Sequence, residues 1–372
     1  ELYNGSRTLV YRGYRESDSL PVVIKLLKNA YPSFSELVQF RNQYTISKNL
    51  NYPAIIQTYS LEAYHNGYVL VMEDFGGISL KDYFNDLKTL NKTSLLTEFL
   101  QFAISLCDIL EILYQQRIIH KDIKPANILI NPENKQVKLI DFSIASLLNK
   151  ETQEIKNPNI LEGTLAYLSP EQTGRMNRGI DYRSDFYSLG ITFYELLTGE
   201  LPFVSDDAME LVHCHIAKQP ASVNSEEIPQ VLNDIVIKLM AKNAEDRYQS
   251  ALGLKHDLEN CLHQIKDTGK VTGFQIAQRD ICDRFIIPDK LYGRDKEVEQ
   301  LLEAFERVSS GNSEMMLVAG FSGIGKTAVI NEVHKPIVKQ RGYFIKGKFD
   351  QFNRNIPLDA FVQAFRDLMK QL

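Results

Sequence analysis

The spacing of apolar residues predicts that the chain begins with strands and continues mainly with helices. Two β-type runs, RTLVYRGYR and PVVIKLL, lie within residues 1–30, and apolar residues recur at helical spacing over 34–50. GYVLVMEDFGG has the pattern of a buried strand that ends at a Gly-Gly break. A broad apolar face over 95–113 predicts a long helix, and helical patterns dominate from 185 to about 265.

Two further segments predict local structure at more specific positions. Residues 127–130 and 137–140 are expected to pair as a hairpin across NPENKQ. After a polar, Gly-containing stretch, KDTGKVTGFQ, the run MMLVAG predicts a strand that leads into a Gly-rich turn and a helix, TAVINEVH. We therefore expect an α+β unit followed by the start of an α/β unit.

Composition and charge narrow the class of protein. The chain has 372 residues, of which 44% are hydrophobic and 24% charged, which is enough for a substantial core and more than one domain. A net charge of -5 makes nucleic-acid binding a poor expectation. No apolar run approaches the ~20 residues that cross a bilayer. The four cysteines lack paired spacing, which favours buried thiols in a reducing cytoplasm; they are Cys107, Cys214, Cys261 and Cys282.

The stretch IIHKDIKPANILI places charged groups between β-type apolar residues, and DFS follows after the predicted hairpin. Asp122, Lys124, Asn127 and Asp141 are therefore expected to meet at the rim of one cleft. Phosphoryl transfer needs such groups: a carboxylate that accepts the proton of the attacking hydroxyl, a cation near the phosphate, and oxygen ligands for Mg²⁺. A polar turn between two buried strands would explain one or two of these residues, but not the ordered set that begins at His120.

A second phosphate-binding pattern is GFSGIGKT, which fits G-x-x-x-x-G-K-T between a predicted strand and a predicted helix. Gly320, Gly323 and Gly325 would let backbone amides wrap the phosphates, Lys326 would reach the β- and γ-phosphates, and Thr327 would bind Mg²⁺. A flexible Gly-rich turn without function would leave the Lys-Thr pair unexplained. No acidic strand that would complete the site follows before the last residue, so we expect nucleotide binding here, without hydrolysis by this piece alone.

The first of these motifs resembles the catalytic loop of a protein kinase domain, and the likeness covers residues 1 to about 265. The resemblance implies that Asp122 is the catalytic base, that Asn127 and Asp141 bind Mg²⁺, and that Lys25 in VVIK contacts the α- and β-phosphates of ATP. It also implies a serine/threonine kinase, because Lys124 occurs together with Thr164 in EGTLAY.

The same resemblance implies two larger sets of residues. The adenine and phosphates of ATP would be contacted in part by Gly5, Val10, Val23, Lys25, Glu73, Phe75 and Leu129. Met72 would be the gatekeeper beside the adenine. A second set would have structural or regulatory roles in the helix next to Lys25, in the activation segment and in the lower, helical lobe. This set consists of Gln43, Thr164, Glu171, Asp185 and Arg247.

The sequence departs from the kinase pattern at several positions. Only Gly5 remains of the three glycines expected ahead of Val10, and Gln43 stands where the partner of Lys25 is a Glu. Glu36 is too close in sequence to replace it. Ser143 follows Asp-Phe in place of Gly, and Lys121 replaces the Arg that often binds a phosphorylated activation segment. Two hypotheses stay open: an active but slow kinase, and a nucleotide-binding pseudokinase that serves as a signalling scaffold.

The whole chain resembles large bacterial, often cyanobacterial, signalling proteins that combine a serine/threonine kinase, an ATP-binding domain and a sensor histidine kinase. The phrases that carry this likeness include EGTLAYLSPEQTGRMNRGIDYRSDFYSLG and LVAGFSGIGKT. The likeness implies a bilobal kinase-like domain over 1–265, a linker over 266–290, and the first part of a P-loop ATPase domain over 291–372. Further implications are ATP and Mg²⁺ as cofactors, a protein substrate with Ser or Thr, and sensory and histidine kinase modules beyond the last residue.

Overall fold

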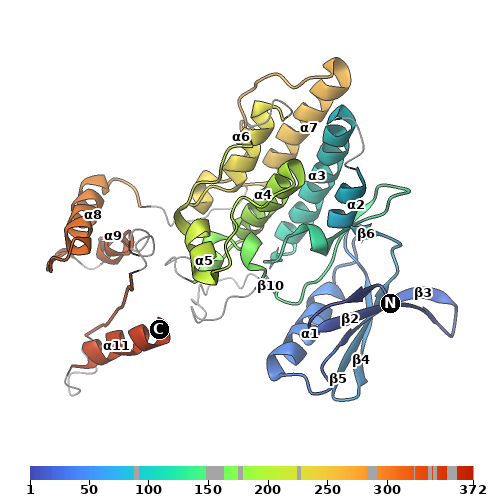
Figure 1. Cartoon of the computed structure of the whole chain (residues 1–372), viewed down its shortest axis with the longest axis horizontal. Coiled ribbons are helices and arrows are strands. Elements are labelled where there is room, and N and C mark those ends of the chain that lie inside the picture. Colours follow the sequence, from blue (N-terminus) through green and yellow to red (C-terminus); the bar gives the residue numbers. More distant parts are fainter. Residues whose placement is uncertain are drawn as a thin grey trace.

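The structure is a computed structural model, and it describes residues 1–87, 92–147, 163–174, 179–223, 228–282, 291–321, 323–333, 337, 342–349 and 358–371. The first 73 residues form an antiparallel sheet with one helix, which we call the sheet lobe (Figure 1). Its five strands lie in the order β1-β2-β3-β5-β4. Their bounds are Tyr3–Asn4 (β1), Thr8–Arg15 (β2), Leu20–Leu27 (β3), Thr58–Tyr64 (β4) and Gly67–Glu73 (β5).

Helix α1, Phe34–Ser47, packs on β4 and β5. It begins with a capping box, in which Ser33 and Glu36 satisfy each other's backbone N–H groups. Glu36 therefore caps the N-terminus of α1, one turn before Phe40. The buried face of α1 includes Phe40 and Gln43, and Phe40 joins Leu70 and Met72 in a small core of the sheet lobe.

The following residues, 78–268, form a helical lobe with the main hydrophobic core (Figure 1). Helix α3 lies against α7, and α4 lies against α6. Helix α4 is buried along most of its length, as its apolar sequence predicts. The helices are Leu80–Leu87 (α2), Lys92–Gln115 (α3), Arg183–Thr198 (α4), Ala208–Ala217 (α5), Gln230–Leu239 (α6) and Ala251–Thr268 (α7).

Short strands and 3-10 turns on the helical lobe contain or adjoin the candidate site residues. The predicted hairpin is confirmed: β8 (Ile128–Ile130) pairs with β9 (Val137–Leu139), and β6 (Ile78–Ser79) pairs with β8. Strand β7 (Ile118–Ile119) pairs with β10 (Ser146–Leu147). The 3-10 turns are Pro125–Asn127 (η1), Leu165–Tyr167 (η2), Pro170–Thr173 (η3) and Ala244–Asp246 (η4).

The two lobes are joined by backbone hydrogen bonds at β9. The N–H of Leu139 donates to Ala54 O at 3.1 Å, and its carbonyl accepts from Ile56 N at 3.2 Å. Leu139 is fully buried. The end of the hairpin is therefore fixed against the sheet lobe, next to the segment that contains Asp141.

Residues 272–282, within the predicted linker, contact the helical lobe. The carboxylate of Asp280 accepts hydrogen bonds from Gln249 N and Ser250 N, both at 2.8 Å, at the start of α7. Ala277 N donates to Asp257 at 2.7 Å. Gly253 makes this approach possible, because a Cβ there would lie 2.6 Å from the Cα of Asp280. The last part of the predicted linker, 283–290, lies outside the described residues, and the domain boundaries stay predictions.

The C-terminal part contains helices α8 (Asp295–Ser309), α9 (Lys326–Asn331) and α11 (Asp359–Gln371). The strand predicted for MMLVAG, residues 315–320, is wrong: the structure has no strand there. A strand needs hydrogen-bonding neighbours, and the described residues beyond α7 contain no other strand that could pair with it. Across the described ranges, none of the helices is long and apolar enough to cross a bilayer.

Candidate active site

Four donors converge on the carboxylate of Asp122. Its Oδ2 accepts from Lys124 Nζ at 2.6 Å and from Asn127 Nδ2 at 2.8 Å. Its Oδ1 accepts from the backbone N–H of Thr164 at 3.1 Å and from the Thr164 hydroxyl at 2.9 Å. Lys124 also donates to the Thr164 hydroxyl. A carboxylate offers about four lone-pair sites, so the cluster fixes both the position and the orientation of Asp122.

Asp185 of α4 fixes the backbone of the loop that carries Asp122. The carboxylate of Asp185 accepts from the backbone N–H groups of His120 and Lys121, both at 2.8 Å. The His120 ring is fully buried, donates from Nε2 to Ile140 O at 3.0 Å, and accepts at Nδ1 from Asp122 N. This arrangement requires the neutral Nε2–H tautomer. The imidazole thus ties the Asp122 loop to the residue before Asp141.

Lys25 lies between α1 and Asp141. Its ammonium donates to Gln43 Oε1 at 2.9 Å and lies 3.1 Å from Asp141 Oδ2. Both Lys25 and Gln43 are buried, and the Lys25 ammonium also lies over the ring of Phe40, 5.7 Å from its centre. Gln43, the residue that the kinase pattern placed opposite Lys25, is therefore the one that Lys25 contacts, and the bond is between an ammonium and a neutral amide.

Asn127 and Asp141 lie at the same end of the hairpin, because Ile140 N donates to Asn127 O at 3.0 Å. Burial would raise the pKa of Asp141, but the charge of Lys25 and hydrogen bonds from Lys25 and Ser143 lower it to about 2. Asp141 is therefore ionised at neutral pH. Asn127 uses the amide nitrogen Nδ2 for its bonds to Asp122. These bonds leave the side-chain amide oxygen Oδ1 available.

These two side chains fit Mg²⁺. The described residues contain no group of three or more His, Cys, Asp or Glu side chains that could hold a metal by themselves. Mg²⁺ does not need such a group, because it is held by one or two protein oxygens together with phosphate oxygens and water. An ionised Asp141 and the amide oxygen of Asn127 are donors of this kind.

Sequence reasoning missed Asn42, which precedes Gln43 on α1. Its Nδ2 donates to Ser143 O at 3.0 Å and to Ala145 O at 2.8 Å, with a longer contact to Phe142 O at 3.4 Å. A lone Asn on a helix has no sequence signature, so only the structure could show this contact. Ser143 also proves compatible with its position, because the positive φ of this segment, 65°, is at Asp141.

The residues expected to contact adenine lie on strands of both lobes, Val10 on β2, Val23 on β3 and Leu129 on β8. Val10 is paired with Lys25, and Val23 with Met72, in the sheet lobe. Val10, Val23 and Leu129 are only half-buried, which leaves apolar surface. Gly5 lies in the turn between β1 and β2, where its N–H donates to Thr8 O at 2.9 Å.

Glu73 and Phe75 lie where the chain passes from the sheet lobe to the helical lobe. Lys138 of β9 donates to Glu73 Oε1 at 2.6 Å, and its ammonium lies over the Phe75 ring, 4.9 Å from the ring centre. The carbonyl oxygen of Phe75 accepts from Asn131 Nδ2 at 3.3 Å. The side chain of Glu73 is therefore engaged, and its backbone N–H donates to Gln57 O at 2.9 Å.

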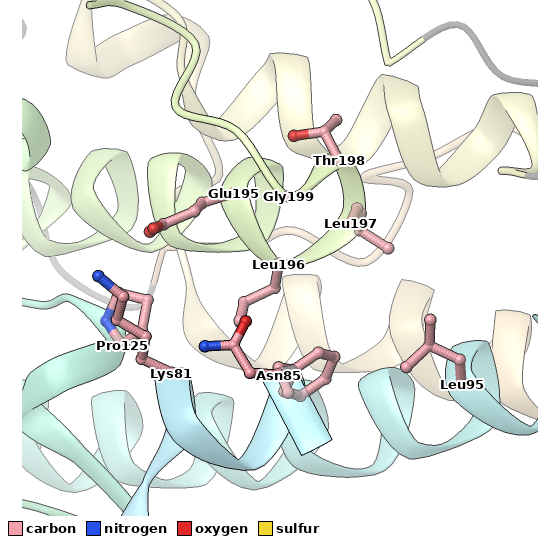
Figure 2. Close-up of a pocket in the computed structure, with 10 residues that line it drawn as sticks. Lys81, Asn85, Leu95, Pro125, Glu195, Leu196, Leu197, Thr198 and Gly199 are labelled. Carbon is pink, nitrogen blue, oxygen red and sulfur yellow. The ribbon is translucent and has the colours of Figure 1, made fainter. Parts of the chain in front are cut away.

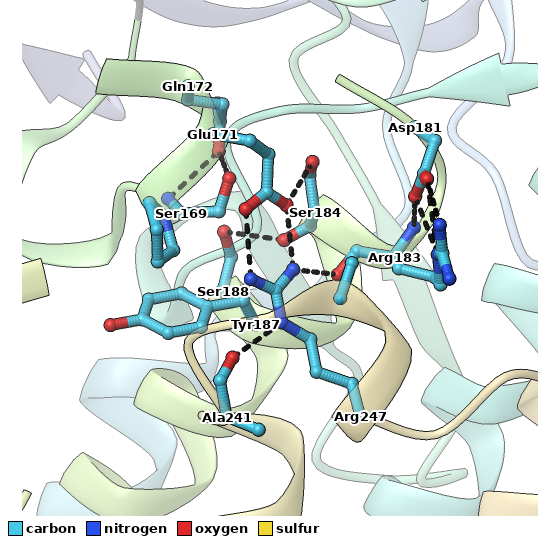
Figure 3. Close-up of polar contacts among 12 residues, drawn as sticks. Ser169, Glu171, Gln172, Asp181, Arg183, Ser184, Tyr187, Ser188, Ala241 and Arg247 are labelled. Atoms are coloured by element: carbon cyan, nitrogen blue, oxygen red, sulfur yellow. Dashed lines mark hydrogen bonds and ion pairs between the residues drawn. The ribbon is translucent and has the colours of Figure 1, made fainter. Parts of the chain in front are cut away.

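A fully buried ion pair braces the helical lobe (Figure 3). Arg247 donates to both oxygens of Glu171, at 2.6 and 2.8 Å, and its remaining donors reach the carbonyl oxygens of Ala241, Arg183 and Lys242. Burial would raise the pKa of Glu171, but Arg247 and a hydrogen bond from Ser184 lower it to about 2. The pair joins η3 to the loop before α7.

A cavity of about 350 Å³ borders the catalytic loop at Pro125 (Figure 2). It lies between α2 and the end of α4, and its polar lining comes from the side chains of Lys81, Asn85, Glu195 and Thr198. Tyr167 links the lining of the cavity to the Asp122 cluster by hydrogen bonds. Its hydroxyl donates to Glu195, and its backbone N–H donates to Thr164 O. It contains none of the residues that the sequence selected as catalytic.

The second phosphate-binding motif forms a loop before α9. Gly323 and Gly325 have φ of 81° and 95°, a region that other residues avoid. Lys326, the first residue of α9, donates to the carbonyl oxygens of Gly320 and Phe321, both at 2.8 Å. Thr327 is exposed. The Lys326 ammonium thus lies over the loop whose amides would face a phosphate.

Comparison with known families follows the division of the chain. Residues 1–258 match the family described as protein kinase domain, and residues 290–372 match the family described as AAA ATPase domain.

Three relatives match this chain at 34 to 35% identity. Hybrid signal transduction histidine kinase G of Dictyostelium discoideum is 35% identical over 361 residues, which cover 73% of this chain and 10% of that protein. A probable serine/threonine-protein kinase of Clostridium perfringens is 34% identical over 273 residues, covering 72% and 38%. Serine/threonine-protein kinase PknB of Mycobacterium tuberculosis is 34% identical over 233 residues, covering 61% and 36%. The chain thus spans 10 to 38% of the length of these relatives.

Proposed function

The chain belongs to the protein kinase family, and from that premise we propose that it transfers the γ-phosphate of ATP to Ser and Thr hydroxyls of proteins. One observation carries the proposal, the arrangement of two charged groups. Asp122 is oriented by Lys124, Asn127 and Thr164. An ionised Asp141, which follows the β8–β9 hairpin, pairs with Lys25. Phosphoryl transfer depends mainly on positioning and electrostatic stabilisation, and these two groups serve those purposes.

Asp122 is proposed to accept the proton of the attacking hydroxyl. Because four donors already occupy its carboxylate, the substrate hydroxyl must replace one of them. The Thr164 hydroxyl can turn away without moving the backbone, a charge or the proposed Mg²⁺ ligand Asn127. Lys124 remains bound to Asp122 and supplies positive charge next to the transferring phosphate.

Lys25 is proposed to bind the α- and β-phosphates, and Asn127 and Asp141 are proposed to hold Mg²⁺. When bound, the metal offsets the negative charge of the phosphates. Gln43 keeps Lys25 in place, and Asp185 keeps the backbone of the Asp122 loop in place. The half-buried faces of Val10, Val23 and Leu129, together with the backbone of Glu73 and Phe75, are proposed to hold the adenine.

The protein substrate is proposed to approach Asp122 beside the cavity at Pro125. The cavity has one wall in the catalytic loop, and Tyr167 connects its Glu195 to the segment that carries Thr164. The relatives named serine/threonine-protein kinases and the bond between Lys124 and Thr164 both support hydroxyl side chains of Ser and Thr as acceptors.

Residues 291–372 are proposed to form the first part of a regulatory ATP-binding domain. Gly320, Gly323, Gly325, Lys326 and Thr327 would hold the phosphates and Mg²⁺, which the match to the AAA ATPase family supports.

The longer protein is proposed to act in cytoplasmic signalling of the two-component type, with sensory and histidine kinase modules. The relative named a hybrid histidine kinase supports this setting. Three of the four cysteines, Cys107, Cys214 and Cys261, have buried thiols, which is compatible with a reducing compartment. The boundaries 1–265, 266–290 and 291–372 are part of the same proposal.

A second candidate function is a nucleotide-binding scaffold without phosphotransfer. The observation that favours it is that Lys25 donates to the uncharged amide of Gln43, which lacks the Coulomb attraction that a carboxylate would add to this contact. The two functions differ in transfer, since both predict ATP binding.

The test compares the wild-type chain with Asp122→Asn. Transfer of label from γ-labelled ATP to a generic protein substrate and ATP affinity are measured on the same samples. We expect transfer to fall by about 10²-fold or more and ATP affinity to change less than about twofold. Equal transfer by both chains would overturn the assignment of Asp122, and ATP binding without transfer by the wild type would select the scaffold.

A further inference from the structure

Helix α1 carries two adjacent amides that face different parts of the site. Gln43 contacts Lys25, whereas Asn42 contacts the turn that follows Asp141. Neighbouring residues on a helix lie about 100° apart around its axis, so one helix can hold both groups at once. The functional roles given above account for Gln43 and leave Asn42 without one.

Asn42 satisfies several backbone carbonyls of one turn. Ala145 N donates to Phe142 O at 3.2 Å, which closes the turn over 142–145. The carbonyl oxygens of Ser143 and Ala145 accept from Asn42 Nδ2 at 3.0 and 2.8 Å, and that of Phe142 lies at 3.4 Å. An amide nitrogen carries two hydrogens, so the two shorter contacts are the main bonds and the third is shared.

The turn held by Asn42 begins directly after Asp141, whose φ of 65° is unfavourable for a residue with a side chain. Such a conformation persists only when the surroundings fix it. Two of the fixed points are on α1: Gln43 acts through Lys25 on the carboxylate, and Asn42 acts on the backbone that follows. The carboxylate is itself bound to Lys25 at 3.1 Å.

We propose that Asn42 is a positioning residue for phosphotransfer. It holds α1 and the Asp141 segment together through the backbone of residues 142–145, and so compensates for the missing charge at Gln43. The proposal rests on the proposed kinase function, because the role assigned to Asp141 is to bind Mg²⁺ with the nucleotide.

The charge at residue 43 provides the decisive test. If Asn42 compensates for a neutral Gln43, then Gln43→Glu, which gives Lys25 an ionic partner, should recover much of what Asn42→Ala loses. Asn42→Asp keeps the size of the side chain but turns the donor into an acceptor that faces carbonyl oxygens. Asn49→Ala is a matched control, because Asn49 lies just beyond α1, is exposed, and donates only to Thr45 O at 3.4 Å.

The experiment measures kcat, KM for ATP and the Mg²⁺ concentration for half-maximal transfer in the full chain. Loss of two neutral hydrogen bonds predicts that Asn42→Ala raises the Mg²⁺ requirement about 5- to 20-fold. Asn42→Asp should raise it further, and Asn49→Ala should leave it within about twofold. The double variant Asn42→Ala/Gln43→Glu should return to within about threefold of Gln43→Glu alone, a strong coupling of the two sites.

Two results would overturn the proposal. One is a Mg²⁺ requirement in Asn42→Ala that matches Asn49→Ala. The other is a double variant Asn42→Ala/Gln43→Glu whose Mg²⁺ requirement stays as high as that of Asn42→Ala, because an ionic partner for Lys25 would then not substitute for Asn42.

Failure of the kinase function itself is separately detectable. If the wild type transfers no phosphate, Mg²⁺-dependent ATP affinity is measured in the Lys326→Ala background, so that the second site does not contribute. Weaker Mg²⁺-dependent binding in Asn42→Ala than in Asn49→Ala would then support the positioning role without catalysis. Equal affinity in the two variants would reject it.

Discussion

The ion pair between Arg247 and Glu171 makes a strong prediction for stability. Both side chains are buried, with 0% and 2% of their surface exposed, and they share two hydrogen bonds. Arg247→Met introduces an apolar side chain of similar length and leaves the Glu171 carboxylate without its cation. Removing one partner of a buried ion pair costs about 3–5 kcal/mol. We expect the upper part of this range, because carbonyl oxygens of Ala241, Arg183 and Lys242 also lose a donor.

The chain contains a matched control on its surface. Arg12 also contacts both oxygens of a carboxylate, that of Asp74, and the shortest N–O distance is 2.6 Å in both pairs. The side chain of Arg12 is 47% exposed. Because solvent screens such a pair, Arg12→Met should cost only about 0–1 kcal/mol. The two substitutions therefore each remove an arginine that contacts both oxygens of a carboxylate, one in a buried pair and one in a partly exposed pair.

The assay is urea unfolding of the full chain, followed by far-UV circular dichroism and by tyrosine fluorescence, since the sequence contains no Trp. The difference between the two variants is read from their transition midpoints and slopes. Equal losses of unfolding free energy in Arg12→Met and Arg247→Met would refute the reasoning from burial. So would a loss below about 1 kcal/mol in Arg247→Met.

Three further outcomes are expected. The pKa of Glu171 falls from about 4.5 to about 2 on folding, so its contribution to stability is complete above pH 4.5 and is lost as the pH falls toward 2; acid titration of stability should show a smaller loss in Arg247→Met than in wild type. Lys326→Ala should weaken nucleotide binding at the second site only, so calorimetry should lose one binding event while transfer persists. Gly253→Ala should push Asp280 off the start of α7 and cost about 1–3 kcal/mol, with faster proteolysis between 271 and 282; unchanged proteolysis would show that this segment is not held there.

Much of the candidate site could be predicted because its chemistry requires ordered residue types. Asp122, Asn127 and Asp141 follow from spacing along one loop and one hairpin, and Gln43 follows from the resemblance to the kinase pattern. The structure brings each of these side chains within hydrogen-bonding distance of a predicted partner or backbone group. Local patterns suffice here because the hairpin itself brings Asn127 and Asp141 together.

Features that depend on tertiary contacts could not be predicted. Asn42 binds carbonyl oxygens a hundred residues away, and a single amide on a helix gives no indication of such a partner. The contact of Asp280 with Ser250 lies in a polar stretch that resembles a linker. The strand expected at 315–320 failed for the related reason that a strand requires neighbours, which apolar periodicity alone does not supply.

Phosphoamino-acid analysis after incubation with Mg-ATP tests the central claim most directly. The wild-type chain and Asp122→Asn are each incubated with a generic protein substrate and either γ-labelled or α-labelled ATP, and labelled residues are mapped. The account predicts label on Ser or Thr from the γ-labelled nucleotide in the wild type alone. Label that persists in Asp122→Asn, or a folded wild-type chain that binds ATP and leaves every Ser and Thr unlabelled, would contradict it.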